Sequence, residues 1–228
     1  MAKKNGTAAE KNSAKKKTAA KAPSTAKSPD KKELKRTLVH KLGEIEGNPV
    51  GLDQKACKEI AGHLDRHLAA YNVLYHQYHK HHWLVMGPQF RDLHLFLQGH
   101  YEQVHEHLDA IAERLTVLGA IPTCSPSAQE KLAYIEHEPE GQFRNRDMLE
   151  QAILCEKRVC VEMRKTINVA LSHDDFGTKR LAEKWLQYAE DRAHHLEHFL
   201  EADTLEVGLT ATASEVQEDP VLEAMDQD

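Results

Sequence analysis

The chain has 228 residues, of which 40% are hydrophobic and 29% are charged. This suffices for one large domain or two small ones with a packed core, and no run approaches the roughly twenty apolar residues that a membrane span requires. The net charge of −6 conceals an asymmetry: residues 1–36 carry twelve Lys and Arg against three acidic residues, and the remainder carries 18 against 33. A basic arm of charge +9 on a body of charge −15 indicates a polyanionic partner for the arm and cation handling for the body.

Both ends of the chain have the composition of tails. Residues 1–30 are rich in Lys, Ala, Ser, Thr and Pro and have no large apolar residue after Met1. We therefore expect residues 1–36 to be a disordered basic tail and residues 203–228, with eight acidic residues and no Lys or Arg, to be an acidic tail. A transit peptide is the alternative for the first segment, although its charges are Lys rather than Arg. The folded domain is then residues 37–202.

Between these tails the sequence follows a helical period. The first predicted helix begins near Asp53 and ends before Gly87-Pro88, and its stripe recurs at spacings of 4, 3, 4, 3 and 4 along Leu64, Leu68, Tyr71, Tyr75, Tyr78 and His82. A second stripe runs from Phe90 to Leu118, through Leu93, Leu97, Tyr101, Val104, Leu108, Ile111 and Leu115.

Three further helices are predicted after Gly119. A short one follows Ser125-Pro126 and runs to about Ile135, inside a long connection. The third long helix carries Leu149, Ile153, Cys160, Met163 and Ile167, and the fourth carries Leu181, Trp185, Arg192, Leu196 and Phe199. Strand-like alternation is absent. The fold class predicted is all-α: a ferritin-like four-helix bundle with a short helix in the long central crossover connection.

The second helix carries candidate metal ligands. Sixteen His is an unusual number, and ten of them fall between His63 and His107. At about 100° per residue, one face of this helix contains His94, Gln98, His105, Asp109 and Glu113. Asp109 and Glu113 are one turn apart, so both can reach one cation. The plain alternative is an ordinary solvated face.

His94 and Asp109 cannot bind the same ion within one straight helix, because fifteen residues span about 22 Å. Either they serve separate sites, or an antiparallel second copy brings its His end to the first copy's carboxylates. His82 lies across a short loop from His94 and can join it. Two imidazoles and two carboxylates suit iron, with zinc as a competitor.

These residues also carry a family resemblance. The run from Tyr75 to Gly119 resembles the Dps family of mini-ferritins at His82-Trp83, Gly87, Phe90, Leu93-His94, Tyr101 and Asp109–Arg114. The segments YHQYHKHHW (Tyr75–Trp83) and YIEHEPEG (Tyr134–Gly141) are similar to its cyanobacterial branch. The resemblance implies a cytoplasmic dodecameric shell that oxidises Fe(II) with peroxide or O2, stores Fe(III) and protects DNA.

The resemblance also assigns residues. It places the ferroxidase centre between subunits, with His82 and His94 from one subunit and Asp109 and Glu113 from its neighbour, and makes Trp83 a neighbouring radical trap. Core packing is the alternative role for Trp83. Many family members have a carboxylate where this chain has Gln98, and a neutral amide binds iron weakly. His105, one turn before Asp109, is the candidate replacement ligand. If it binds, zinc becomes a stronger competitor for iron at this centre.

The basic arm resembles the Lys-rich tails with which some Dps proteins hold DNA. The candidate DNA-binding residues are Lys3, Lys4, Lys11, Lys15, Lys16, Lys17 and Lys21. Such an arm contacts phosphates without reading bases. Binding of this kind would associate the protein with the nucleoid. The alternative is a tail that only aids solubility.

Three other features bear on these predictions. Cys57, Cys124, Cys155 and Cys160 form no CxxC motif and follow no apolar signal peptide, so we expect reduced thiols in a cytoplasmic protein. A di-iron centre inside one bundle would use Glu102-x-x-His105 and Asp191-x-x-His194. A mainly architectural DNA-compacting protein with weak or zinc-occupied metal sites is the alternative that Gln98 favours.

Overall fold

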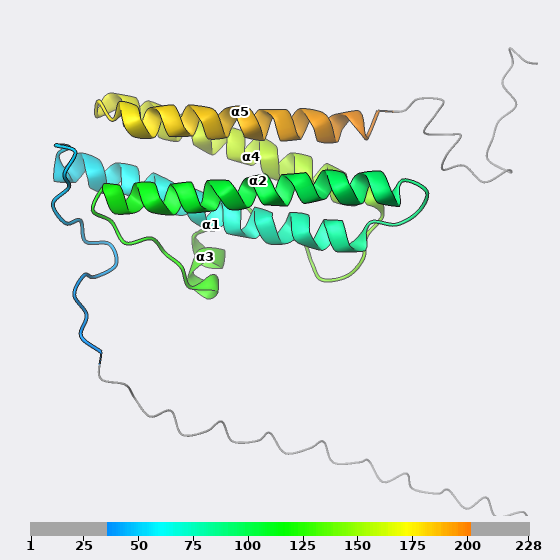
Figure 1. Cartoon of the computed structure of the whole chain (residues 1–228), viewed down its shortest axis with the longest axis horizontal. Coiled ribbons are helices and arrows are strands. Elements are labelled where there is room, and N and C mark those ends of the chain that lie inside the picture. Colours follow the sequence, from blue (N-terminus) through cyan, green and yellow to red (C-terminus); the bar gives the residue numbers. More distant parts are fainter. Residues whose placement is uncertain (1–35, 202–228) are drawn as a thin grey trace, which may run out of the picture. The chain divides into compact units, whose positions relative to one another are not determined.

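The computed structural model describes residues 36–201, which form five helices without a β-strand. The helices are α1 (Gln54–Leu84), α2 (Phe90–Val117), α3 (Pro126–Leu132), α4 (Asn145–Ser172) and α5 (Phe176–His198). The four long helices run alongside one another, and α3 interrupts the connection from α2 to α4 (Figure 1). The predicted fold class is confirmed. Apart from Arg36, both predicted tails lie outside the described residues.

The predicted stop and start signals set the helix ends. Asp53 caps α1, because its carboxylate accepts hydrogen bonds from the backbone N–H groups of Lys55 and Ala56. Gly87 turns the chain between α1 and α2 with a φ of 86°, a region that glycine enters without steric cost. Asp175 likewise caps α5 by accepting from the backbone N–H of Thr178.

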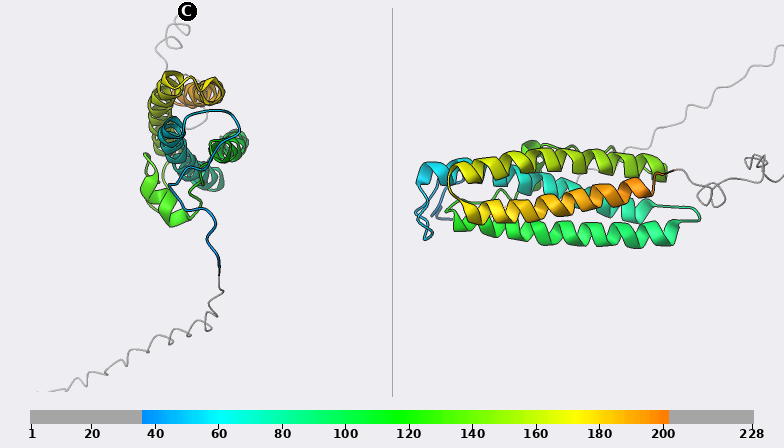
Figure 2. Two further views of the ribbon diagram at one scale, coloured as in Figure 1. Left: turned by 90° about the vertical axis from the view of Figure 1, so that its left-hand side faces the viewer. Right: turned by 90° about the horizontal axis from the view of Figure 1, so that it is seen from above.

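Seen along the helix axes, the four long helices surround one interior, and α3 lies outside it (Figure 2). Most of the predicted stripe residues are buried there, including Leu64, Leu97, Ile111 and Trp185. A few stripe residues are less covered than the others. Phe90 is 45% exposed, and Tyr75 and Tyr101 are half-buried and pack against the core.

A charged pair occupies the middle of the bundle. Glu156 of α4 accepts two hydrogen bonds from the guanidinium of Arg192 of α5, at 2.6 and 3.0 Å, and a third from the hydroxyl of Tyr78 at 2.7 Å. Arg192 also donates to the side-chain oxygen of Gln103 on α2. All four long helices therefore contribute to this network. Burial alone would lower the pKa of Arg192, but the adjacent Glu156 carboxylate raises it, so the guanidinium stays charged.

Two buried histidines of α2 flank the charged pair. Burial, and then the positive charge of Arg192, lower the pKa of His100 and of His107 to about 3. Both imidazoles are consequently neutral at physiological pH.

This arrangement contradicts the alternative of a di-iron centre inside one bundle. Glu102, His105, Asp191 and His194 are all exposed, so the two predicted Glu/Asp-x-x-His motifs point away from the interior. The polar groups buried between the four long helices include the Arg192–Glu156 ion pair, not either predicted motif.

Replacing Arg192 by Ala should destabilise the protein by about 3–5 kcal/mol, because it leaves the Glu156 carboxylate buried without its counter-ion. Arg164→Ala is the matched control: it breaks the Arg164–Glu190 pair between the same two helices, which is half exposed at both partners and should cost at most about 1 kcal/mol. Urea unfolding followed by circular dichroism measures both. Equal losses for the two variants would contradict the assignment.

The long connection is fastened to the bundle by polar contacts. The hydroxyl of Tyr134 lies 2.7 Å from Nδ1 of His67, whose Nε2 lies 2.8 Å from the hydroxyl of Thr166 on α4. Further along, Lys80 forms an ion pair with Glu138 at 2.9 Å. Within residues 36–201, no helix combines the length and apolar composition needed to cross a membrane.

Candidate metal centre

The α1–α2 hairpin brings His82 and His94 together, as the sequence predicted. His82 lies in the last turn of α1 and His94 in the second turn of α2. Their imidazole rings stack with centroids 3.6 Å apart and planes inclined by 22°. His82 is buried and His94 is half-buried.

A reciprocal pair of hydrogen bonds holds these two rings. Nδ1 of His82 donates to the backbone carbonyl of His94 at 2.7 Å, and Nδ1 of His94 donates to the carbonyl of His82 at 2.8 Å. A carbonyl oxygen only accepts, so both Nδ1 atoms carry protons. In the neutral rings both Nε2 atoms then keep a lone pair. A backbone carbonyl bound to the remote ring nitrogen is also the usual support of metal-binding histidines.

The two predicted carboxylates lie elsewhere on the same chain. Asp109 and Glu113 are exposed on α2, and neither carboxylate has a hydrogen bond or ion pair among the described residues. By helix geometry, Asp109 lies about 22 Å and Glu113 about 28 Å from His94 along the axis of α2. Within residues 36–201, no group of three or more His, Cys, Asp or Glu residues converges on a point where one ion could bind. The predicted ligands therefore lie on one chain as two separate pairs.

Gln98 and His105 lie along α2 between the histidine pair and the carboxylate pair. The side-chain amide of Gln98 donates to the carboxylate of Glu102 at 2.8 Å, which leaves its oxygen free. His105 is exposed, and its ring lies 5.5 Å from that of Tyr75. Its role as a ligand stays a prediction.

Replacing His105 with Ala should weaken binding at one metal position more than at the other, and should reduce inhibition of iron oxidation by Zn(II). The reason is that an imidazole supplies the nitrogen that zinc favours where Gln98 offers only a neutral oxygen. A structure soaked in Zn(II) is the direct measurement, since Zn–N bonds are about 2.0–2.1 Å long. Finding the His105 nitrogens beyond about 3 Å from every metal would disprove the assignment.

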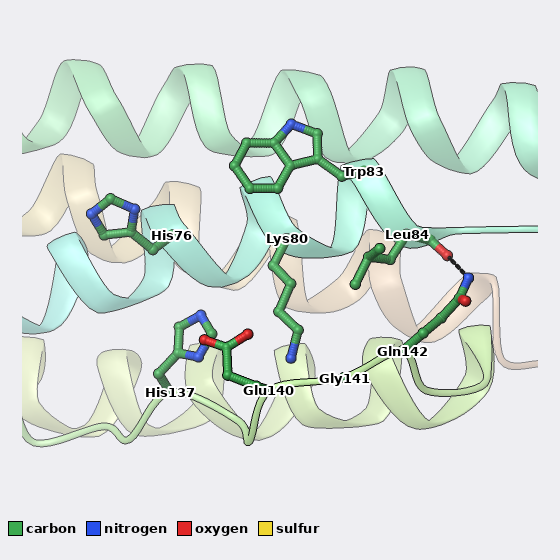
Figure 3. Close-up of a pocket in the computed structure, with 8 residues that line it drawn as sticks. All are labelled: His76, Lys80, Trp83, Leu84, His137, Glu140, Gly141 and Gln142. Atoms are coloured by element: carbon green, nitrogen blue, oxygen red, sulfur yellow. Dashed lines mark hydrogen bonds between the residues drawn. The ribbon is translucent and has the colours of Figure 1, made fainter. Parts of the chain in front are cut away.

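Trp83 lies beside the histidine pair and is 64% exposed, so core packing within the chain is not its role. Its indole stacks on the ring of His79, with centroids 4.9 Å apart and planes inclined by 23°. Trp83 lines the pocket that α1 forms with the connection, and Figure 3 shows its indole directed away from the connection, where the amide of Gln142 donates to the carbonyl of Leu84 at 2.9 Å. A large exposed indole at this position is available for contact with a second molecule.

An aromatic cluster around His79 was not predicted from the sequence. The His79 ring lies 4.0 Å from that of Tyr101 and 4.7 Å from that of Tyr75, and Tyr101 lies 5.3 Å from the ring of His82. Burial, followed by the neighbouring His82, lowers the pKa of His79 and favours its neutral form. The helical spacing of Tyr75, His79 and His82 could have revealed the cluster, because all three share one side of α1.

Comparison with known proteins identifies the class. The model of the ferritin-like domain family matches residues 61–205. A nutrient stress-induced DNA-binding protein of the cyanobacterium Nostoc is 37% identical over 178 residues, which cover 78% of this chain and 97% of that relative. A DNA protection during starvation protein of Halobacterium salinarum is 37% identical over 164 residues, which cover 72% of this chain and 90% of that relative.

Solved structures agree with these relatives. The crystal structure of an archaeal Dps homologue from Halobacterium salinarum matches with a TM-score of 0.72 and 35% identity, over 75% of this chain and 95% of that one. Dps from Thermosynechococcus elongatus matches with a TM-score of 0.65 and 30% identity, over 69% of this chain and 98% of that one. Fold and sequence thus define a ferritin-like protein. Within that class, the chain belongs to the Dps family, and its similarity to cyanobacterial members is confirmed.

Proposed function

We propose that this protein is a cytoplasmic mini-ferritin that oxidises Fe(II) and stores Fe(III) inside a dodecameric shell, thereby protecting DNA. The observation that carries the proposal is the division of one ligand set into two half-sites: the stacked His82–His94 pair and the unpaired carboxylates of Asp109 and Glu113. A Dps structure from Vibrio cholerae is described as a member of the ferritin-like diiron-carboxylate superfamily, which supports iron as the substrate.

An antiparallel second copy of the α1–α2 face completes the site. Such a copy would bring its Asp109 and Glu113 to the first copy's His82 and His94, at two symmetry-related positions. The exposed Trp83 and Phe90 would be covered in the same contact, which removes two large apolar side chains from water.

Each residue has a defined task toward the substrate. The Nε2 lone pairs of His82 and His94 bind Fe(II), while the carboxylates balance the charge that grows as the iron is oxidised. Two Fe(II) ions lose one electron each, and one hydrogen peroxide takes both electrons as its O–O bond breaks, giving two hydroxides. We assign Trp83, the residue after His82, the interception of a stray radical.

The test of this proposal is direct. The full chain should oxidise Fe(II) with a ratio of two iron ions to one peroxide, and crystals soaked in Fe(II) should show anomalous density between His82 and His94 of one copy and Asp109 and Glu113 of another. Density confined to one chain, or oxidation no faster than in buffer, would contradict it and would favour the architectural alternative. Zn(II) should compete for the same density.

DNA binding through Lys3, Lys4, Lys11, Lys15, Lys16, Lys17 and Lys21 is the second function that we propose. The Nostoc relative is named a DNA-binding protein, and this supports the proposal together with the charge of +9 on residues 1–36. The arm lies almost wholly outside the described residues, so the proposal rests on its composition and on the name of that relative.

A further inference from the structure

The C-terminal end of α5 carries a histidine pair far along the chain from the proposed ferroxidase residues. His194 and His198 are four residues apart and therefore share one face of the helix. Their Nε2 atoms approach to 3.1 Å, and the ring centroids lie 4.3 Å apart at an angle of 65°. Both side chains are exposed.

This distance matches that between two ligands of one metal ion. Zn–N bonds of about 2.0–2.1 Å at a tetrahedral angle place two nitrogens roughly 3.3 Å apart. Two neutral imidazole nitrogens can approach this closely only when a proton lies between them or when both lone pairs bind a cation. A pair of His at positions i and i+4 on one helix face is also the spacing with which helical zinc sites bind their metal.

The local charge favours a cation. The pair lies at the carboxyl end of α5, where the unsatisfied carbonyl groups place a partial negative charge. The carboxylate of Glu201 lies 3.4 Å from Nδ1 of His198. A carboxylate near Nδ1 favours the proton on that nitrogen, which leaves the Nε2 lone pair available. Many metal-binding histidines have a carboxylate in this position.

We propose that His194 and His198 form a surface site for one divalent transition metal ion of the zinc, nickel and copper group, which imidazole nitrogen prefers. Water completes the coordination, because no third His, Cys, Asp or Glu of the described residues joins the pair. A site with two protein ligands exchanges its metal readily, so it captures ions at the surface without holding them permanently. The site is independent of the proposed ferroxidase function.

The experiment uses the full chain carrying His82→Ala and His94→Ala, so that Zn(II) or Ni(II) binding at the proposed ferroxidase centre does not obscure the signal. Calorimetric titration with Ni(II) and Zn(II) should detect one equivalent per chain. Adding His194→Ala or His198→Ala should weaken that event at least tenfold, whereas His195→Ala, a matched exposed neighbour on the same turn, should leave it unchanged. Equal affinities for the three variants, or absence of the event in the parent, would overturn the proposal.

A second measurement needs no substitution. In the unmodified protein, Zn(II) should protect His194 and His198 from acylation by diethyl pyrocarbonate, as read by mass spectrometry of the peptides, and should leave His195 reactive. Equal labelling of the three histidines with and without Zn(II) would overturn the site even if every variant failed to fold.

Discussion

Protein in which His82 and His94 are both replaced by Ala should oxidise Fe(II) at least about 100-fold more slowly than the unmodified protein, and so should protein with Asp109→Ala and Glu113→Ala. Loss of a single outer-shell partner costs about 10–100-fold in metal sites, and each variant here loses two direct ligands. The rates follow from the absorbance of Fe(III) after addition of peroxide or O2. Each variant alone lacks one half of every centre.

Mixed assemblies distinguish an intersubunit centre from two separate sites. When the two double variants are dissociated and reassembled together, a dimer with one copy of each regains one centre that has both histidines and both carboxylates. We therefore expect mixing to restore part of the activity. Mixtures that stay inactive while the unmodified protein is active would refute the intersubunit centre. Glu106→Ala, an exposed carboxylate on the same helix, is the control and should leave the rate unchanged.

The four-helix bundle could be predicted because each long helix has one apolar face and clear end signals. Asp53 and Gly87 bound α1 as expected, and the long α2–α4 connection identified the crossover. Tyr75 and Tyr101 fall on the predicted stripes but are only half-buried against the core, since periodicity gives the direction of a stripe but not its width.

The histidine pair was predictable only in part. The short loop indicated that His82 and His94 are neighbours, but their exchange of Nδ1 hydrogen bonds depends on the register of two helices, which no local pattern encodes. Arg192 could be placed on the buried stripe of the fourth helix. Its partner Glu156 could not be identified, because an ion pair across 36 residues leaves no mark on the spacing of either helix.

Deleting residues 1–36 should abolish binding of the protein to DNA. These residues carry twelve of the 30 Lys and Arg, whereas the rest of the chain has a net charge of −15 and repels phosphates. Among residues 36–201 the buried core begins at Ala56, and residues 1–30 have no large apolar residue after Met1, so the deletion should leave assembly and iron oxidation unchanged. Gel-shift titrations with duplexes of unrelated sequence measure the binding, and iron oxidation by the same preparation controls for folding.

The intact protein should bind those duplexes with equal affinity, because a lysine arm without aromatic stacking residues has no means of reading base edges. If roughly 6–10 phosphates are neutralised, affinity should fall about 10³–10⁵-fold between about 50 and 200 mM salt, with a slope near −0.9 per phosphate. Several arms on one shell would strengthen these weak contacts through avidity. Removing residues 203–228, whose eight carboxylates compete for the same lysines, should strengthen binding. Failure of the intact protein to retard DNA at low salt would show that the arm serves solubility and that DNA is not a partner.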